Sequence, residues 1–199
     1  MKIKEINRMV VKIGSSLLID RDKGVNNNFL NNISEDILSL KKRGIETLVV
    51  SSGAIELGKI ELDKTKEKFN LAESQAASSI GQIKLINSWK ESLSKFDLNA
   101  AQILITAEDT ENRKRFLNAR STIEELIHER YIPIINENDT VATSEINDGD
   151  NDSLAARIAG LVSADSLLLL SNVEGLYEKD PSEGELSHIH ILTLPTNRE

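Results

Sequence analysis

The sequence has no cysteine, no long hydrophobic run and no excess of positive charge. The absence of cysteine excludes disulfide bonds, thiolate nucleophiles and cysteine-ligated metal sites. No segment approaches the roughly 18 apolar residues that a membrane span needs, and residues 1–8 lack the apolar core of a signal peptide. These absences predict a cytoplasmic protein with no membrane partner.

Acidic residues outnumber basic ones. The 199 residues include 24 Lys and Arg against 32 Asp and Glu, which gives a formal net charge of −8. The densest basic cluster is only 113–115, whereas nucleic-acid binding requires clustered positive charge. We therefore expect no nucleic-acid partner. Hydrophobic residues make up 39% of the chain, which suits one soluble globular domain over 1–199.

Short aliphatic and β-branched runs alternate with longer segments of helical periodicity. The predicted strands are 8–13, 47–50, 101–105, 131–135 and 166–170. The predicted helices are centred on 29–40, 72–95, 116–127 and 154–161. This alternation is typical of βαβ units and predicts an α/β fold, a three-layer αβα sandwich with a mainly parallel sheet. The carboxyl ends of most strands should then meet at one edge, where ligands usually bind.

Several local predictions accompany this fold. Gly44 stands where a helix C-cap glycine belongs, and Trp89 is interpreted as a packing residue. Residues 139–150 carry turn and strand signals and are predicted to form a hairpin. The long helix has its apolar residues on or near one face: Ala76, Ile80, Ile83, Ile86 and Leu93.

Two strand ends carry a glycine-containing turn. Lys12 leaves the first strand beside Gly14, and Ser52 and Gly53 follow the second strand. A lysine beside such a turn can direct its ammonium group at phosphate, while the turn's N–H groups bind anions. Taken alone, the Lys12 turn is better explained as an ordinary strand end, and the Ser52 turn has a serine helix cap as its alternative.

The strongest candidate site is the pair of polar blocks 136–139 and 149–152. Asparagine and carboxylate side chains clustered at the carboxyl edge of a sheet suit an ammonium group, magnesium or both. The alternative is a pair of Asx turns with a helix cap at Asp152. His188 and His190 have no third ligand nearby in the sequence, so no protein metal site is predicted.

Read together, eight blocks resemble the glutamate 5-kinase branch of the amino acid kinase family. The blocks are VVKIGSSLL (10–18), VVSSGAIELG (49–58), SQAASSIGQ (74–82), AQILIT (101–106), RFLNAR (115–120), PIINENDTVATSEI (133–146), GDNDSLAARIA (149–159) and LLLLSNVEGLYEKDP (167–181). They occur in the order found in that family and cover nearly the whole chain.

The resemblance implies ATP-dependent phosphorylation of the glutamate side-chain carboxylate to glutamyl 5-phosphate, the first step of proline biosynthesis. The nucleophile is then the substrate's own carboxylate, which needs no general base because its pKa is about 4.3. The implied ligands are glutamate and ATP, with Mg²⁺ carried mainly by ATP and proline as a feedback inhibitor. A homo-oligomeric assembly is also expected.

The same resemblance assigns roles to individual positions. The catalytic positions are Lys12 and Asp152, the latter as the carboxylate that orients the active-site lysine. The substrate-binding positions are Ser52, Asn136, Asp139 and Asn151. The ATP-binding positions are Lys12, Gly14, Ser15, Ser171 and Asn172.

The sequence departs from the family near its end. The family continues with a Gly-Gly-Met-x-Thr-Lys segment that supplies a second phosphate-binding lysine, and no such motif occurs in these residues. The kinase domain is therefore expected to be incomplete at its C-terminus, without the nucleotide-binding segment or any further domain. Two alternatives are a non-catalytic protein that binds glutamate or proline, and a truncated product retaining only the substrate half.

Overall fold

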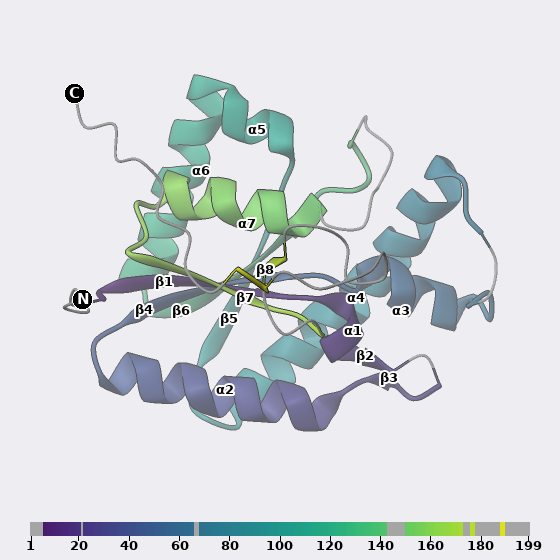
Figure 1. The fold of residues 1–199 in the computed structure, drawn as a ribbon, viewed down its shortest axis with the longest axis horizontal. Helices are drawn as coiled ribbons and strands as arrows, with labels where there is room; N and C mark the ends of the chain where they lie inside the picture. Colours follow the sequence, from purple (N-terminus) through teal and green to yellow (C-terminus); the bar gives the residue numbers. More distant parts are fainter. Residues whose placement is uncertain are drawn as a thin grey trace.

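A five-stranded parallel sheet lies between two layers of helices (Figure 1). The computed structural model describes residues 6–20, 22–65, 68–142, 150–172, 176–177 and 188–189. In spatial order the strands are β5 (Asn99–Ile105), β6 (Tyr131–Glu137), β4 (Glu46–Ser51), β1 (Arg8–Ile13) and β7 (Ser166–Leu170). Each neighbouring pair runs parallel, so the carboxyl ends of all five strands share one edge, called here the carboxyl edge. The predicted α/β sandwich is confirmed.

The helices are divided between the two faces of the sheet. In Figure 1, α5, α6 and α7 lie above the sheet, and α2 and α4 lie below it. The helices are α1 (Ser15–Leu18), α2 (Asn27–Lys42), α3 (Ala54–Glu61), α4 (Leu71–Ser94), α5 (Ala107–Glu111), α6 (Arg113–His128) and α7 (Asp150–Leu161). Two small antiparallel pairs are β2 (Ile19–Asp20) with β3 (Gly24–Val25), and β8 (Leu176–Tyr177) with β9 (His188–Ile189).

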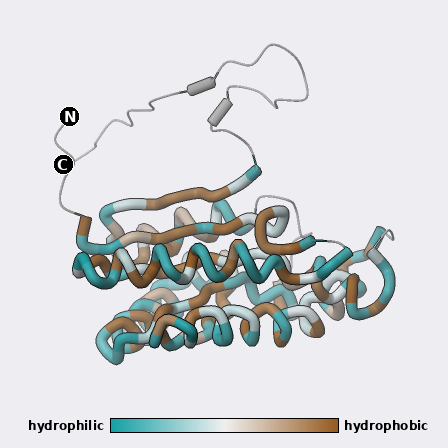
Figure 2. The backbone as a smooth tube through the Cα atoms, turned by 90° about the horizontal axis from the view of Figure 1, so that it is seen from below, coloured by the Kyte–Doolittle hydropathy of each residue, from teal (hydrophilic) through white to brown (hydrophobic). Residues whose placement is uncertain are grey.

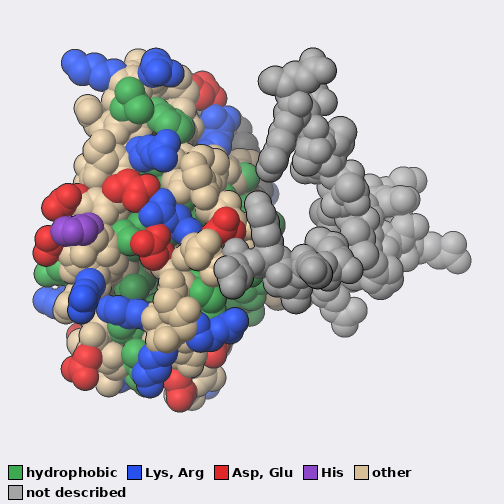
Figure 3. Space-filling view, turned by 90° about the vertical axis from the view of Figure 1, so that its left-hand side faces the viewer, with side chains coloured by type: hydrophobic (Ala, Val, Ile, Leu, Met, Phe, Trp, Pro, Cys, Tyr) green, Lys and Arg blue, Asp and Glu red, His purple; other side chains and the backbone are tan. Residues whose placement is uncertain are grey.

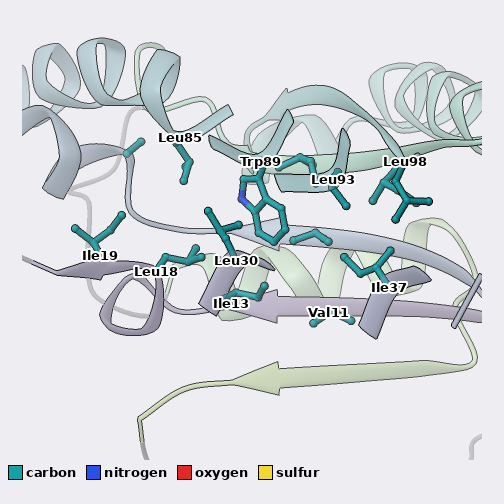
Figure 4. Close-up of a cluster of buried hydrophobic side chains, with 14 of the residues drawn as sticks. Val11, Ile13, Leu18, Ile19, Leu30, Ile37, Leu85, Trp89, Leu93 and Leu98 are labelled. Carbon is teal, nitrogen blue, oxygen red and sulfur yellow. The ribbon is translucent and has the colours of Figure 1, made fainter. Parts of the chain in front are cut away.

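The sheet has a hydrophobic core on each face. Successive side chains of a strand point to opposite faces, so Val11 joins the cluster under α2 and α4 whereas Val10 joins the cluster under α6 and α7. Figure 4 shows the first cluster, where Trp89 of α4 lies among aliphatic side chains. Burial on both faces explains the nearly continuous apolar runs of the central strands β1, β4 and β6, whereas the edge strands β5 and β7 are more exposed. Along the helices, hydrophobic and hydrophilic segments alternate (Figure 2).

Local signals in the sequence set the helix ends. The side chain of Asn26 accepts a hydrogen bond from the Phe29 N–H and caps α2. Gly44, just beyond that helix, has a φ of +78°, which confirms the predicted C-cap glycine. Asn70 and Glu73 form a reciprocal capping box at the start of α4.

The buried face of α4 differs from the prediction. Ile80 and Ile83 are 39% and 64% exposed, and Ala76 is exposed, so of the five residues predicted on or near one face only Ile86 and Leu93 pack in the core. The buried positions are Ala77, Ser78, Gly81, Leu85, Trp89, Ser92 and Leu93. Trp89 is fully buried, which confirms it as a packing residue.

Contact between α3 and α4 explains why small residues occupy this inner face. A Cβ atom added to Gly58 would lie 1.9 Å from the backbone oxygen of Ala77. One added to Gly81 would lie 1.9 Å from the backbone oxygen of Ala54. The two backbones therefore touch, and only glycine fits at either position.

The edge opposite the carboxyl edge is held by an ionic cluster around Arg8. Its guanidinium group donates hydrogen bonds to Glu46, to both oxygens of Glu124 and to the carbonyl of Val162. The hydrogen bond from Arg8 lowers the pKa of Glu124 despite the opposing effect of burial. On the face shown in Figure 3, acidic and basic side chains of the described part of the chain are interspersed.

Some predictions concern residues outside the described part. The hairpin predicted over 139–150 includes 143–149, which the structure does not describe, while 139–141 form a turn. The side chain of His188 and all of His190 also lie outside it. Within the described residues, no helix combines the length and the hydropathy needed to cross a membrane.

Candidate functional site

A cavity of about 1180 Å³ opens at the carboxyl edge of the sheet. Residues that follow β1, β4, β6 and β7 line it, because parallel strands bring these turns to the same edge. Nine of the ten predicted site residues line this cavity: Lys12, Gly14, Ser15, Ser52, Asn136, Asp139, Asn151, Ser171 and Asn172. The tenth, Asp152, contacts Lys12. The structure thus brings together residues that are far apart in the sequence.

Lys12 and Asp152 form an ion pair beside the cavity. The Lys12 Nζ atom lies 2.5 Å from Asp152 Oδ1. Lys12, the second-last residue of β1, is only 8% exposed, whereas the side chain of Asp152 is 49% exposed. Asp152 stands in the first turn of α7, where the helix dipole favours a negative charge. This carboxylate holds the lysine ammonium in place at the edge of the sheet.

The Gly14 turn differs from the expected anion cradle. The Gly14 N–H donates a 3.0 Å hydrogen bond to the carbonyl of Leu170, so in this structure it is not directed at a ligand. The bond instead ties the end of β1 to the end of β7. Gly14 contributes to the cavity wall, and Ser15 begins α1 beside it.

The Gly53 turn has a strict requirement for glycine. Its φ is +110°, in the left-handed region that other residues avoid. A Cβ atom there would also lie 2.9 Å from the side chain of Ile19. This turn connects the end of β4 to the start of α3. The N–H of Ser52, the residue before Gly53, donates a hydrogen bond to the carbonyl of Ile13.

A network of side-chain hydrogen bonds connects three residues that line the cavity, Ser52, Asn136 and Asn151, to Gln82 of α4. The Asn151 Nδ2 atom donates to Ser52 Oγ at 2.7 Å and to Asn136 Oδ1 at 3.2 Å. The Asn136 Nδ2 atom in turn donates to Gln82 Oε1 at 2.8 Å. These four residues, called here the amide network, come from α4, the turn after β4, β6 and α7, so the network exists only in the folded protein.

The network leaves one acceptor without a donor. Both amide hydrogens of Asn151 are used, and its Oδ1 atom is buried with no hydrogen-bond partner among the described residues. A buried polar atom without a partner is costly. A ligand that brings an N–H or O–H group would therefore be favoured at this point.

Asp139 adds a buried carboxylate to the same cavity. It is 7% exposed and follows β6, where the turn over 138–142 holds it. Ser78 of α4 donates a 2.5 Å hydrogen bond to Asp139 Oδ2. Asp139 and Asn151 both line this cavity and both contribute acceptor oxygens, which suits a ligand with a cationic donor group.

Several residues at the site were not among the predicted site residues. Ser78 and Gln82 contact site residues from α4, and Lys59, Lys68 and Phe69 line the cavity. The Lys59 ammonium lies 4.6 Å from the Phe69 ring centroid, within reach of a cation–π interaction. The signal for Ser78 and Gln82 was their spacing of four residues on one helix face.

Comparison with known proteins gives a consistent picture. Residues 7–194 match the model of the amino acid kinase family. The glutamate 5-kinase of Rhizobium rhizogenes is 55% identical over 174 residues, which are 87% of this chain and 45% of the relative. That of Agrobacterium fabrum is 54% identical over 88% of this chain and 45% of the relative. Glutamate 5-kinase 1 of Rhizobium meliloti is 52% identical over 90% and 46%.

The chain spans less than half the length of these relatives. The family match nevertheless covers nearly all of its residues, and the parallel sheet with helices on both faces carries the matched blocks in order. The chain belongs to the amino acid kinase family.

Proposed function

We propose that the cavity at the carboxyl edge binds glutamate and ATP and that phosphate is transferred to the glutamate side-chain carboxylate. The observation that carries the proposal is the pairing of two features in one cavity. Lys12, held by Asp152, supplies a positive charge for phosphate. Asp139 and Asn151 Oδ1 supply acceptors for the ammonium group of an amino acid.

The proposed reaction requires no general base. An oxygen of the ionised side-chain carboxylate attacks the γ-phosphorus of ATP, the bond to the bridging oxygen breaks, and ADP leaves with that electron pair. Because no proton is removed, the protein must supply position and charge stabilisation rather than acid–base chemistry. Lys12 is proposed to neutralise charge on the transferring phosphoryl group.

Magnesium is proposed to arrive on the phosphates of ATP. The carboxylate of Asp152 pairs with Lys12 and that of Asp139 accepts from Ser78, so phosphate and water oxygens would supply most ligands. Bound magnesium would neutralise phosphate charge. Ser15, Ser171 and Asn172, which line the cavity, are proposed to contact the nucleotide.

The remaining expected partners are part of the same proposal. Proline carries an ammonium and a carboxylate like those of glutamate, and we propose that it competes for the acceptors of Asp139 and Asn151. A cytoplasmic location and a homo-oligomeric assembly are also proposed.

The proposal is tested by trapping the acyl phosphate with hydroxylamine. We expect ATP- and glutamate-dependent hydroxamate formation that Lys12→Ala and Asp152→Ala both abolish. Activity that survives both changes would show that the chemistry has been misplaced. Calorimetric titration with each ligand separates the alternative, because a non-catalytic binding protein would bind glutamate without binding ATP.

A further inference from the structure

Three polar side chains of α4 contact the segment 136–142, which includes the proposed substrate-binding residues Asn136 and Asp139. Gln75, Ser78 and Gln82 are spaced by three and four residues, so they share one helix face. Gln75 Nε2 donates to the carbonyl of Ala142 at 3.1 Å, Ser78 donates to Asp139 and Gln82 accepts from Asn136. The segment 136–142 is therefore hydrogen-bonded to α4 at both of its ends and in its middle.

The position of these polar side chains is fixed by backbone contact. Gly58 and Gly81 allow α3 and α4 to touch, and Ser78 and Gln82 each follow directly after a residue of that contact, Ala77 and Gly81. Two backbones in contact cannot move closer together, so the position of α4 relative to α3 is fixed. The positions of Ser78 and Gln82 beside the cavity are fixed with it. Ser78 is 5% exposed, so water does not compete strongly for its bond to Asp139.

We propose that Ser78 and Gln82 are positioning residues that make this cavity select ligands carrying an amino group. Neither residue needs to touch the substrate. Ser78 fixes the rotamer of Asp139 by holding one carboxylate oxygen. Gln82 acts on Asn151 through Asn136. The inference deepens the proposed function and rests on it, because it concerns how glutamate would be recognised at that site.

The role of Gln82 follows from the direction of each hydrogen bond. Its Oε1 atom can only accept, so Asn136 turns its Nδ2 atom towards Gln82 and its Oδ1 atom towards Asn151. Asn151 must then donate from Nδ2, which leaves its own Oδ1 atom as the buried acceptor without a donor. If Gln82 no longer accepted, the Asn136 amide would be free to turn over, and the acceptor offered to a ligand would be lost.

The test compares glutamate with glutarate, which has the same two carboxylates but no amino group. NMR titration of the full chain gives both dissociation constants, since it also measures weak binding. For Ser78→Ala and Gln82→Met we expect glutamate binding to weaken about tenfold, with glutarate binding unchanged within a factor of two. Gln82→Glu keeps an acceptor for Asn136 and should retain the selectivity of the unaltered protein.

Ser92→Ala is the matched control. Ser92 is a buried serine on the same helix, 3% exposed, whose hydroxyl lies 2.8 Å from that of Ser34, away from the cavity. The Ser92→Ala variant should lose comparable stability but keep the ratio of the glutamate and glutarate dissociation constants. The inference is overturned if Ser78→Ala and Gln82→Met leave that ratio unchanged, or if Ser92→Ala changes it equally. Failure of the unaltered protein to bind glutamate would instead overturn the proposed function, and this inference with it.

Discussion

The ammonium of Lys12 lies 2.5 Å from the carboxylate of Asp152, and this contact joins the end of β1 to the first turn of α7. The two partners are unequally buried, because Lys12 is 8% exposed whereas the Asp152 side chain is 49% exposed. Losing its partner is therefore more costly for the buried ammonium of Lys12 than for the half-exposed carboxylate of Asp152.

Removing the aspartate should cost more stability than removing the lysine. Asp152→Asn leaves a mostly buried ammonium without its countercharge, and we expect a loss of about 1–2 kcal/mol, below the value for a fully buried pair because Asp152 is half exposed. Lys12→Met removes the buried charge itself and should cost less. Urea unfolding of both variants checks this order, and a larger loss for Lys12→Met would contradict it.

Trp89 should stabilise the sheet by hydrogen bonding as well as by burial. Its Nε1 atom donates a 2.9 Å bond to Ser51 Oγ at the end of β4, directly before the cavity residue Ser52. Trp89→Phe leaves a gap and removes that donor, so we expect a loss of about 2–3 kcal/mol in the free energy of unfolding. Ser51→Ala is the control for the bond alone and should cost about 1 kcal/mol. Equal stability of Trp89→Phe and the unaltered protein would argue against this contact.

Glycine substitutions should have opposite effects in two helices. Gly58→Ala forces a methyl group into the backbone of Ala77, and we expect a loss of about 3 kcal/mol, since α3 and α4 must separate. Gly160→Ala in α7 meets nothing within 4 Å and should gain about 0.5–1 kcal/mol from the higher helix propensity of alanine. Thermal unfolding of the two variants tests whether α3 and α4 are in backbone contact. A Gly58→Ala variant as stable as the unaltered protein would show that the two helices are loosely packed.

The Arg8 cluster should make stability depend on pH in the acidic range. The hydrogen bond from Arg8 lowers the pKa of Glu124 below its ordinary value in the folded protein. A carboxylate with a lowered pKa contributes stability that is present above the unfolded-state pKa, about 4.3 for glutamate, and lost as pH falls through the folded-state pKa. Glu124→Gln removes this contribution.

The measurement for Glu124→Gln is urea unfolding at pH 7 and at pH 3. The variant should be less stable than the unaltered protein at pH 7, and the difference should shrink at pH 3. A difference that stays constant between the two pH values would show that the Arg8–Glu124 pair does not contribute through its charge.

The sequence predicted the sheet well because each strand is a short aliphatic run, buried on both faces in the central strands β1, β4 and β6 and still apolar in the more exposed edge strands β5 and β7. The boundaries of β1 and β7 agree with the predicted ranges, and the other strands extend them by a few residues. The short helices α1 and α5 were missed because they are too short to show a hydrophobic period, whereas a helix after Gly53 was one of the two interpretations of that turn and is confirmed by α3.

The inner face of α4 could not be found from apolar spacing. Its close contact with α3 selects alanine, serine and glycine, whereas Ile83 faces outward. The partners of Ser78 and Gln82 lie 61 and 54 residues further along the chain, so only the folded structure brings them together. For the same reason, the bond from the Gly14 N–H to Leu170 was not expected.

The central claim is that the buried acceptors at the carboxyl edge bind the ammonium group of glutamate. Calorimetric titration of glutamate into the unaltered protein and into Asp139→Asn tests it most directly, with Asp36→Asn, an exposed position in α2, as the matched control. We predict saturable binding to the unaltered protein and to Asp36→Asn, and binding at least tenfold weaker to Asp139→Asn. Equal binding to all three proteins, or no binding to the unaltered one, would contradict the claim.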